Sequence, residues 1–128
     1  MYVRFVVDEI DPDCGVELGI FQAMFRLWRA GKLAPHEEAW WAEVRAWFNL
    51  KLDEPNRFAR SRRRGANKCA ISWFKASAKA HIRRAREVAA LLAEHQIQSK
   101  MLRSTKPGYV VYEDRFQITA EPFRSEHR

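Results

Sequence analysis

The chain has 128 residues, of which 47% are hydrophobic and 12% aromatic, and its formal net charge is +7 at pH 7. This length and apolar content suit a single globular domain with its own core, and they exclude an intrinsically disordered chain. No stretch approaches the roughly 20 consecutive apolar residues of a membrane-spanning helix, so we expect no membrane partner.

The two cysteines, Cys14 and Cys69, are far apart in the sequence and have unlike neighbours. A secreted domain that depends on disulfides normally contains more cysteine than this. The apolar run at the start of the chain is too short for the core of a signal peptide, and acidic residues follow it at once. We therefore expect a cytoplasmic protein whose core forms without disulfides or metal.

The positive charge is concentrated in one segment. Residues 57–86 contain eleven Lys and Arg and no Asp or Glu, whereas residues 1–56 contain six basic and ten acidic residues. Residues 87–128 are balanced, with six of each sign. A block of like charge raises the local concentration of anions, so this segment predicts an anionic partner.

The first part of the chain predicts a strand followed by two helices. Residues 2–7 are β-branched and aromatic, which indicates a strand. Asp13 is a candidate N-cap for a helix over about 16–30. Pro35, a favoured first-turn residue, predicts the start of a second helix with an aromatic face, which ends before Pro55.

The second part adds one helix and several short strands. Residues 56–68 lack an apolar period and predict a loop, and residues 69–75 predict a strand. Ser77 opens a third helix to about His95. Three short strand-like runs follow, and the last two form a hairpin over residues 109–120. The predicted buried stripe of the third helix consists of Ala78, Ile82, Ala85, Ala89 and Leu92.

This element order predicts the α+β class, with about three helices packed on one face of a mostly antiparallel sheet and a C-terminal β-hairpin. Residues 1–123 are expected to form a single globular domain and residues 124–128 a frayed tail. The expected buried set is Val3, Phe5, Ile20, Met24, Trp28, Val44, Phe48, Ile82, Leu92, Val110 and Ile118.

An arginine-rich run is the sharpest functional feature of the sequence. Guanidinium groups bind phosphate with two parallel hydrogen bonds, and an aromatic ring beside them could stack on a base. The run also fits a solvated loop whose arginines pair with the acidic N-terminal block. The candidate anion-binding residues here are Arg57, Phe58, Arg60, Arg62, Arg63, Arg64 and Lys68.

The third helix extends the same basic region. Lys79, Arg83 and Arg86 have i, i+4, i+7 spacing, so they line one face of that helix. This face could equally be an ordinary exposed helix surface. If the arginine-rich run folds beside it, the two form one continuous positive surface.

These features predict binding of nucleic acid or a nucleoprotein complex, with RNA or single-stranded DNA ahead of duplex. The main alternative is a protein-interaction module, such as an inhibitor, antitoxin or accessory subunit, that meets an acidic protein partner. Such a module needs an exposed anchor, for which Trp40, Trp41 and Trp47 are the candidates. The two adjacent tryptophans cannot both point into one core, although core packing is the simpler interpretation of all three.

A phosphate-handling enzyme is the second alternative, but no catalytic motif supports it. His81 and Glu113, with Asp114 in reserve, are the candidate bases, and we expect His81 on the exposed side of its helix. Neither the four histidines nor the cysteines have zinc-ligand spacing, and the acidic run at residues 8–13 lacks the glycine of a calcium loop. We predict no catalytic residue, metal site or cofactor.

By its pattern, the chain resembles a family of small uncharacterised bacterial proteins. The stretches that carry this resemblance are YVRFVV, RFARSRR, AISWFK and KPGYVVYEDRFQITAEPF, which together span most of the chain. The resemblance implies a single-domain bacterial protein, and it supplies no activity, cofactor or site residue.

Overall fold

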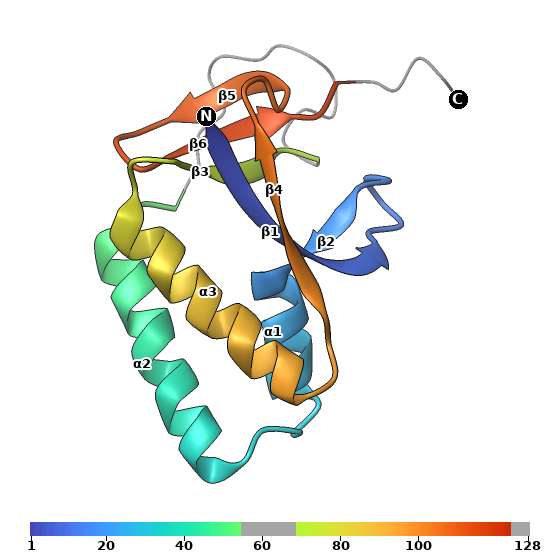
Figure 1. The fold of residues 1–128 in the computed structure, drawn as a ribbon, viewed down its shortest axis with the longest axis vertical. Helices are drawn as coiled ribbons and strands as arrows, with labels where there is room; N and C mark the ends of the chain where they lie inside the picture. Colours follow the sequence, from blue (N-terminus) through green and yellow to red (C-terminus); the bar gives the residue numbers. More distant parts are fainter. Residues whose placement is uncertain (55–68, 124–128) are drawn as a thin grey trace.

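The computed structural model describes residues 1–54 and 69–123 and has three helices beside a curled antiparallel sheet (Figure 1). It confirms the predicted α+β class and the C-terminal hairpin. The elements are β1 (Tyr2–Ile10), β2 (Glu17–Gly19), α1 (Ile20–Arg29), α2 (Pro35–Lys51), β3 (Ile71–Lys75), α3 (Lys79–Glu94), β4 (Ser99–Ser104), β5 (Tyr109–Glu113) and β6 (Gln117–Glu121).

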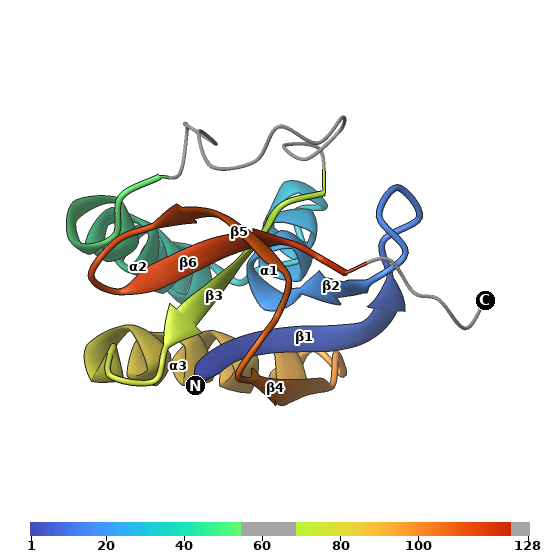
Figure 2. The same ribbon diagram turned by 90° about the horizontal axis from the view of Figure 1, so that it is seen from above.

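Strand β1 organises the sheet, because three other strands pair with it in antiparallel fashion. Strand β4 pairs with one edge of β1 along Tyr2–Val7. The opposite edge is shared: β3 pairs with Tyr2 and Val3, and β2 pairs with Val6 and Ile10. β2 and β3 therefore diverge between these two pairings (Figure 2). We call this place, beside Arg4 and Phe5, the fork.

The core lies between β1 and the helices. Alternate side chains of β1 point the same way in a strand, and Val3, Phe5 and Val7 all enter this core. Most of the residues that were expected to be buried are buried: Val3, Phe5, Ile20, Met24, Val44, Leu92 and Ile118. Trp28, Phe48 and Ile82 pack against the core while partly buried.

Strand β5 departs from the simple alternation that predicted a buried Val110. A bulge lies between Val110 and Tyr112, where the register with β6 shifts. The extra residue turns Val111 inward, so Val111 is 1% exposed and Val110 is only half-buried. The predicted burial of Val110 was wrong by one position.

The start of α1 also differs from the prediction. The residues expected to open a helix at about 16 pair with β1 as strand β2, and α1 begins at Ile20. Gly19 is its N-cap, and the Gly19 N–H donates to Oε1 of Gln22 at 3.1 Å. Asp13 is not a helix cap; its N–H donates to Asp11 Oδ1 in the turn between β1 and β2.

Helix α2 begins at Pro35, as predicted, and its first turn is tied to α3. The Ala34 N–H donates to Glu37 Oε1 at 2.8 Å, and His95 Nε2 lies 3.1 Å from the same oxygen. The Ala34 hydrogen bond holds the pKa of Glu37 below its usual value, against an opposing effect of burial and with help from His95.

Cys14 and Cys69 form a disulfide with a Cα–Cα distance of 5.4 Å, although 55 positions separate them in the sequence. The expectation of a core without disulfides was therefore wrong. The bond joins the β1–β2 turn to the residues just before β3. None of the helices within residues 1–54 and 69–123 is long and apolar enough to cross a membrane.

Candidate functional site: a basic groove between α3 and β4

Helix α3 runs beside β4 and the start of β1 (Figure 1). A groove of about 520 Å³ lies along this junction. Its lining consists of Met1, Val3, Ala76, Lys79, Ile82, Arg83, Arg86, Met101 and Arg103. We call it the basic groove.

Four cations border the basic groove. Lys79, Arg83 and Arg86 occupy the predicted face of α3, and each is exposed. Arg103 reaches the groove from β4, because β4 pairs with β1 and sets Arg103 opposite Val3. Within the described part of the chain, none of these four side chains is ion-paired with a carboxylate. Among the described residues, the positive charge of the groove is therefore not balanced by an ion pair.

The groove also contains apolar surface. Ile82 and Met101 are half-buried in its lining, and Arg86 Nη2 lies 3.8 Å from Met101 Sδ. Cations beside an accessible apolar surface can contact the phosphate backbone and the sugars or bases of a nucleic acid together.

Two other basic residues of the same block are already compensated. Arg84 is 3.3 Å from Glu87 and lies over the Trp47 ring, with 5.3 Å from its Cζ to the ring centroid. Lys75 Nζ lies 2.7 Å from Glu113. These contacts set Arg84 and Lys75 apart from the groove cations, which have no such carboxylate partner among the described residues.

The remaining sequence-predicted site residues cannot be placed beside the groove. Arg57, Phe58, Arg60, Arg62, Arg63, Arg64 and Lys68 lie outside the described residues. Sequence reasoning found Lys79, Arg83 and Arg86 but missed Arg103 and Met101. Only the register of β4 on β1 brings those two to the groove, and helical spacing carries no information about that register.

The prediction of an exposed His81 was wrong. The ring is only 4% exposed and lies among the rings of Trp47, Phe48, Phe74 and Phe116. Its Nε2 lies 2.8 Å from the carbonyl oxygen of Lys51 at the end of α2. Ala78, Ala85 and Leu92 of the predicted stripe are buried, but His81 and Val88 are buried in place of Ile82 and Ala89. The His81 ring turns inward because α2 and β3 bring aromatic rings to it.

The two other candidate bases are engaged in structural contacts. Glu113 pairs with Lys75, as described above. Asp114 closes the β5–β6 turn: its Oδ1 accepts the N–H groups of Phe116 and Gln117, and its Oδ2 accepts the Tyr112 hydroxyl. His81, Glu113 and Asp114 thus each have a separate structural partner.

The tryptophans of α2 differ in burial, as expected for adjacent positions on a helix. Trp41 is buried with 1% exposure, whereas its neighbour Trp40 is half-buried. Trp47 is half-buried beneath Arg84. Full burial of all three would have weakened the interaction-module alternative, but Trp40 and Trp47 are partly exposed, so that alternative stays a prediction.

No cluster of His, Cys, Asp and Glu within the described residues could hold a metal ion. No protein-family model, curated protein or solved structure matches the chain. The resemblance to a bacterial family therefore stays a prediction, and the site must be interpreted from its own chemistry.

Proposed function

We propose that the protein binds single-stranded nucleic acid, with RNA as the first candidate, through the basic groove. The observation that carries this proposal is a set of four cations, without a carboxylate partner among the described residues, in a groove whose lining also contains Ile82 and Met101. Lys79 and Arg86 are seven residues apart on α3, which is about 10 Å along the helix axis. A single strand that lies along α3 would place successive phosphates beside these cations.

The shape of the site favours a single strand over a duplex. Its cations border a groove whose lining also contains Ile82 and Met101. A duplex hides its bases in a stack and presents its phosphates on a wide cylinder, whereas a flexible strand can enter a groove and expose its bases.

The composition of residues 57–68 supports the same proposal. This segment contains five arginines and Lys68, and it contains no acidic residue. Its charge adds to the attraction for phosphate, whatever its conformation, because the field of neighbouring cations sums over distance.

Salt dependence tests the proposal. Binding of labelled oligouridylate and oligothymidylate should be followed by fluorescence anisotropy over a range of salt concentrations. Four phosphate contacts predict a log–log slope of about −3, since each contact on a single strand contributes roughly −0.7. A double variant, Arg83→Ala with Arg86→Ala, should reduce the slope by about 1.4.

A matched control removes the same charge elsewhere. Arg26→Ala with Arg29→Ala changes two basic residues of α1, outside the basic groove, and should leave the slope unchanged. A triple variant, with Arg60, Arg62 and Arg63 changed to alanine, measures how much the arginine-rich run contributes to the salt slope. No binding at low salt, or equal slopes in the groove variant and its control, would overturn the proposal.

The interaction module is the alternative outcome. It predicts that protein partners survive nuclease treatment when the chain is purified from its native host. Recovery of nucleic acid alone would support direct binding, and nuclease-resistant protein partners would reject it in favour of the module.

A further inference from the structure

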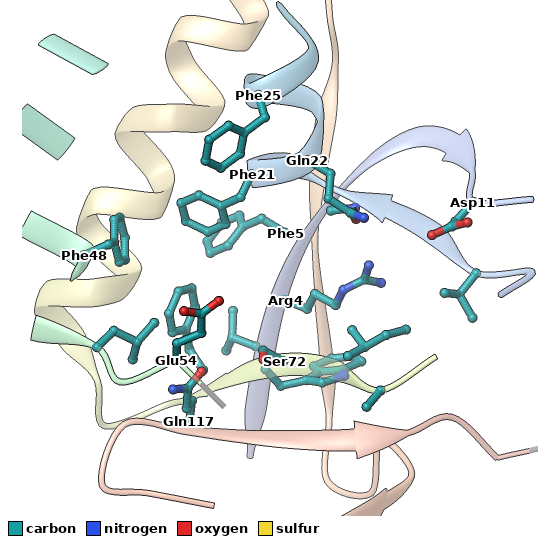
Figure 3. Close-up of a pocket in the computed structure, with 18 of the residues that line it drawn as sticks. Arg4, Phe5, Asp11, Phe21, Gln22, Phe25, Phe48, Glu54, Ser72 and Gln117 are labelled. Carbon is teal, nitrogen blue, oxygen red and sulfur yellow. The ribbon is translucent and has the colours of Figure 1, made fainter. Parts of the chain in front are cut away.

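A second hollow lies at the fork, where β2 and β3 leave the shared edge of β1 (Figure 3). Its volume is about 580 Å³, within the usual range for small-molecule sites. We call it the aromatic hollow, because aromatic rings from four elements line it. They are Phe5 of β1, Phe21 and Phe25 of α1, Trp41 and Phe48 of α2, and Trp73 and Phe74 of β3.

These rings form a wall with edge-to-face geometry. The Phe21 and Phe48 centroids are 5.0 Å apart with their planes at 78°, and the Phe25 and Trp41 centroids are 5.4 Å apart at 79°. Aromatic side chains hold a flat guest in the same offset or perpendicular contacts.

Arg4 lies in the same hollow and is only 9% exposed. Its Nη2 donates to the Glu17 carbonyl oxygen at 2.6 Å. No carboxylate of the described residues is within ion-pair distance of this guanidinium, although Asp11 and Glu17 act on it from further away. Burial lowers the pKa of Arg4, and these two acids oppose that effect.

The neighbourhood of Arg4 adds a second positive group. Arg4 Nη2 is 3.6 Å from the position that a Cβ on residue 19 would occupy, so the guanidinium lies against Gly19, the N-cap of α1. The first turn of α1 contains no acidic residue, and Gly19 has no side chain to cap it. A helix N-terminus carries partial positive charge. Together with the buried guanidinium beside it, this charge favours the binding of an anion.

Two further polar groups that line the hollow are buried without a hydrogen-bond partner among the described residues. They are the indole N–H of Trp41 and Nε of Arg45. A buried donor left without an acceptor is costly, so these two residues of the lining hold polar groups at an energetic cost.

The lining of the hollow also contains acidic residues. Asp11, Asp53 and Glu54 also line the hollow, and Figure 3 shows Asp11 and Glu54 on opposite sides of Arg4. In the same view the Arg4 side chain extends into the space between Gln22 and Asp11, while Phe21 and Phe25 stand together on α1. The hollow thus has a polar end with Arg4 and Asp11 and an aromatic end with Phe21 and Phe25.

We propose that the aromatic hollow binds a small aromatic carboxylate, with the carboxylate at Arg4 and the ring between the walls of α1 and α2. Arginine suits this task because its planar donors match the two oxygens of a carboxylate. This site would be separate from the basic groove, with which it shares only Val3 of the lining.

The test uses two probes of the same shape, naphthoate and the neutral naphthylmethanol, titrated into the wild-type protein by calorimetry and by amide NMR. We expect naphthoate to bind at least about tenfold more tightly, because a charge-assisted hydrogen bond contributes only to the anion. Its shifts should centre on the amides of Gly19 and Phe21 and on the Trp41 indole N–H. Equal affinities, no naphthoate binding, or shifts centred on the basic groove would overturn the proposal.

A variant pair sharpens the assignment to Arg4. Arg4→Met should remove the preference for naphthoate, whereas Arg26→Met, on the exposed side of α1, should keep it. If Arg4→Met does not fold, the comparison of the two probes on the wild-type chain still decides. A folded Arg4→Met protein that retains the tenfold preference would reject Arg4 as the anchor.

Discussion

Arg4 and Arg83 each border a hollow against β1, but water reaches them differently. Arg83 is exposed and has three neighbouring cations in the basic groove, whereas Arg4 is 9% exposed and has one backbone acceptor. Exposed charges attract a polyanion by their number and are screened by salt. A buried guanidinium acts through its fixed geometry and local contacts. One residue type therefore supports two kinds of recognition, and this contrast can be tested.

The largest expected effect concerns the disulfide, which lines the aromatic hollow and has no counterpart in the basic groove. Opening a link between residues 55 positions apart should lower the free energy of unfolding by about 4 kcal/mol in the chain-entropy account. Urea unfolding with and without reductant measures this loss. The double variant Cys14→Ser with Cys69→Ser should match the reduced protein and should not respond to reductant.

The next expected effect is a difference in salt sensitivity between the two sites. Between 50 and 200 mM salt, a log–log slope near −3 means that oligonucleotide affinity falls roughly fifty-fold. Naphthoate affinity should change less than about threefold, since a single buried pair is weakly screened. Anisotropy and calorimetry in matched buffers measure the two responses. A similar salt dependence for both ligands would contradict the distinction between the two sites.

A smaller effect is expected at Asp114, which positions a residue of the aromatic hollow. Asp114 Oδ2 accepts a hydrogen bond from Gln117 Nε2 at 3.0 Å, and Gln117 lines the hollow. Burial raises the pKa of Asp114, but hydrogen bonds from Gln117, Phe116 and Tyr112 outweigh this effect and leave the pKa below its usual value. Asp114→Asn should lower the free energy of unfolding by about 1 kcal/mol near neutral pH. The loss is no larger because the carboxylate is partly exposed to water.

The pH dependence of that loss has a definite sign. A carboxyl whose folded pKa is depressed stabilises the fold above its unfolded pKa, and the contribution disappears as pH falls through the folded value. The difference between wild type and Asp114→Asn should therefore be constant from pH 7 to about 5 and shrink below about 4. Glu43→Gln, at an exposed position of α2, is the control. A difference that grows on acidification would contradict this account.

The smallest effect is expected for the ion pair between Arg26 and Glu9. Both side chains are about half exposed, so water screens their attraction. Arg26→Gln or Glu9→Gln should change the free energy of unfolding by less than about 0.5 kcal/mol, measured by urea unfolding. A loss above 1 kcal/mol would mean that water does not screen this exposed pair, which would contradict the contrast between exposed Arg83 and buried Arg4.

Local sequence patterns predicted the elements well where a short-range period decides them. The start of α2 at Pro35, the fold class and the C-terminal hairpin all follow from caps, breakers and alternation. The errors lie where a distant strand intervenes. Residues 17–19 form strand β2 because they pair with the edge of β1. Val111 is buried instead of Val110 because of the bulge in β5 against β6.

The candidate sites show the same division. Helical spacing alone grouped Lys79, Arg83 and Arg86 on one face. The aromatic hollow was not predictable, since it depends on two strands sharing one edge of β1 and on a disulfide between distant cysteines. His81 was misjudged for a related reason: an apolar stripe read from one helix ignores the rings that other elements bring to it.

The shared edge of β1 has a consequence for the order in which the chain can fold. Strand β1 is synthesised before its three partners, and two of them are far from it in the sequence: β3, which pairs through Phe74 and Lys75, and β4 at residues 99–104. Contacts between distant segments form slowly, because a long loop must close before any of them contributes. While β4 is still being synthesised, one edge of β1 therefore lacks its native partner. A fragment that ends before Ser99 should keep that edge open, and open edges promote association between chains.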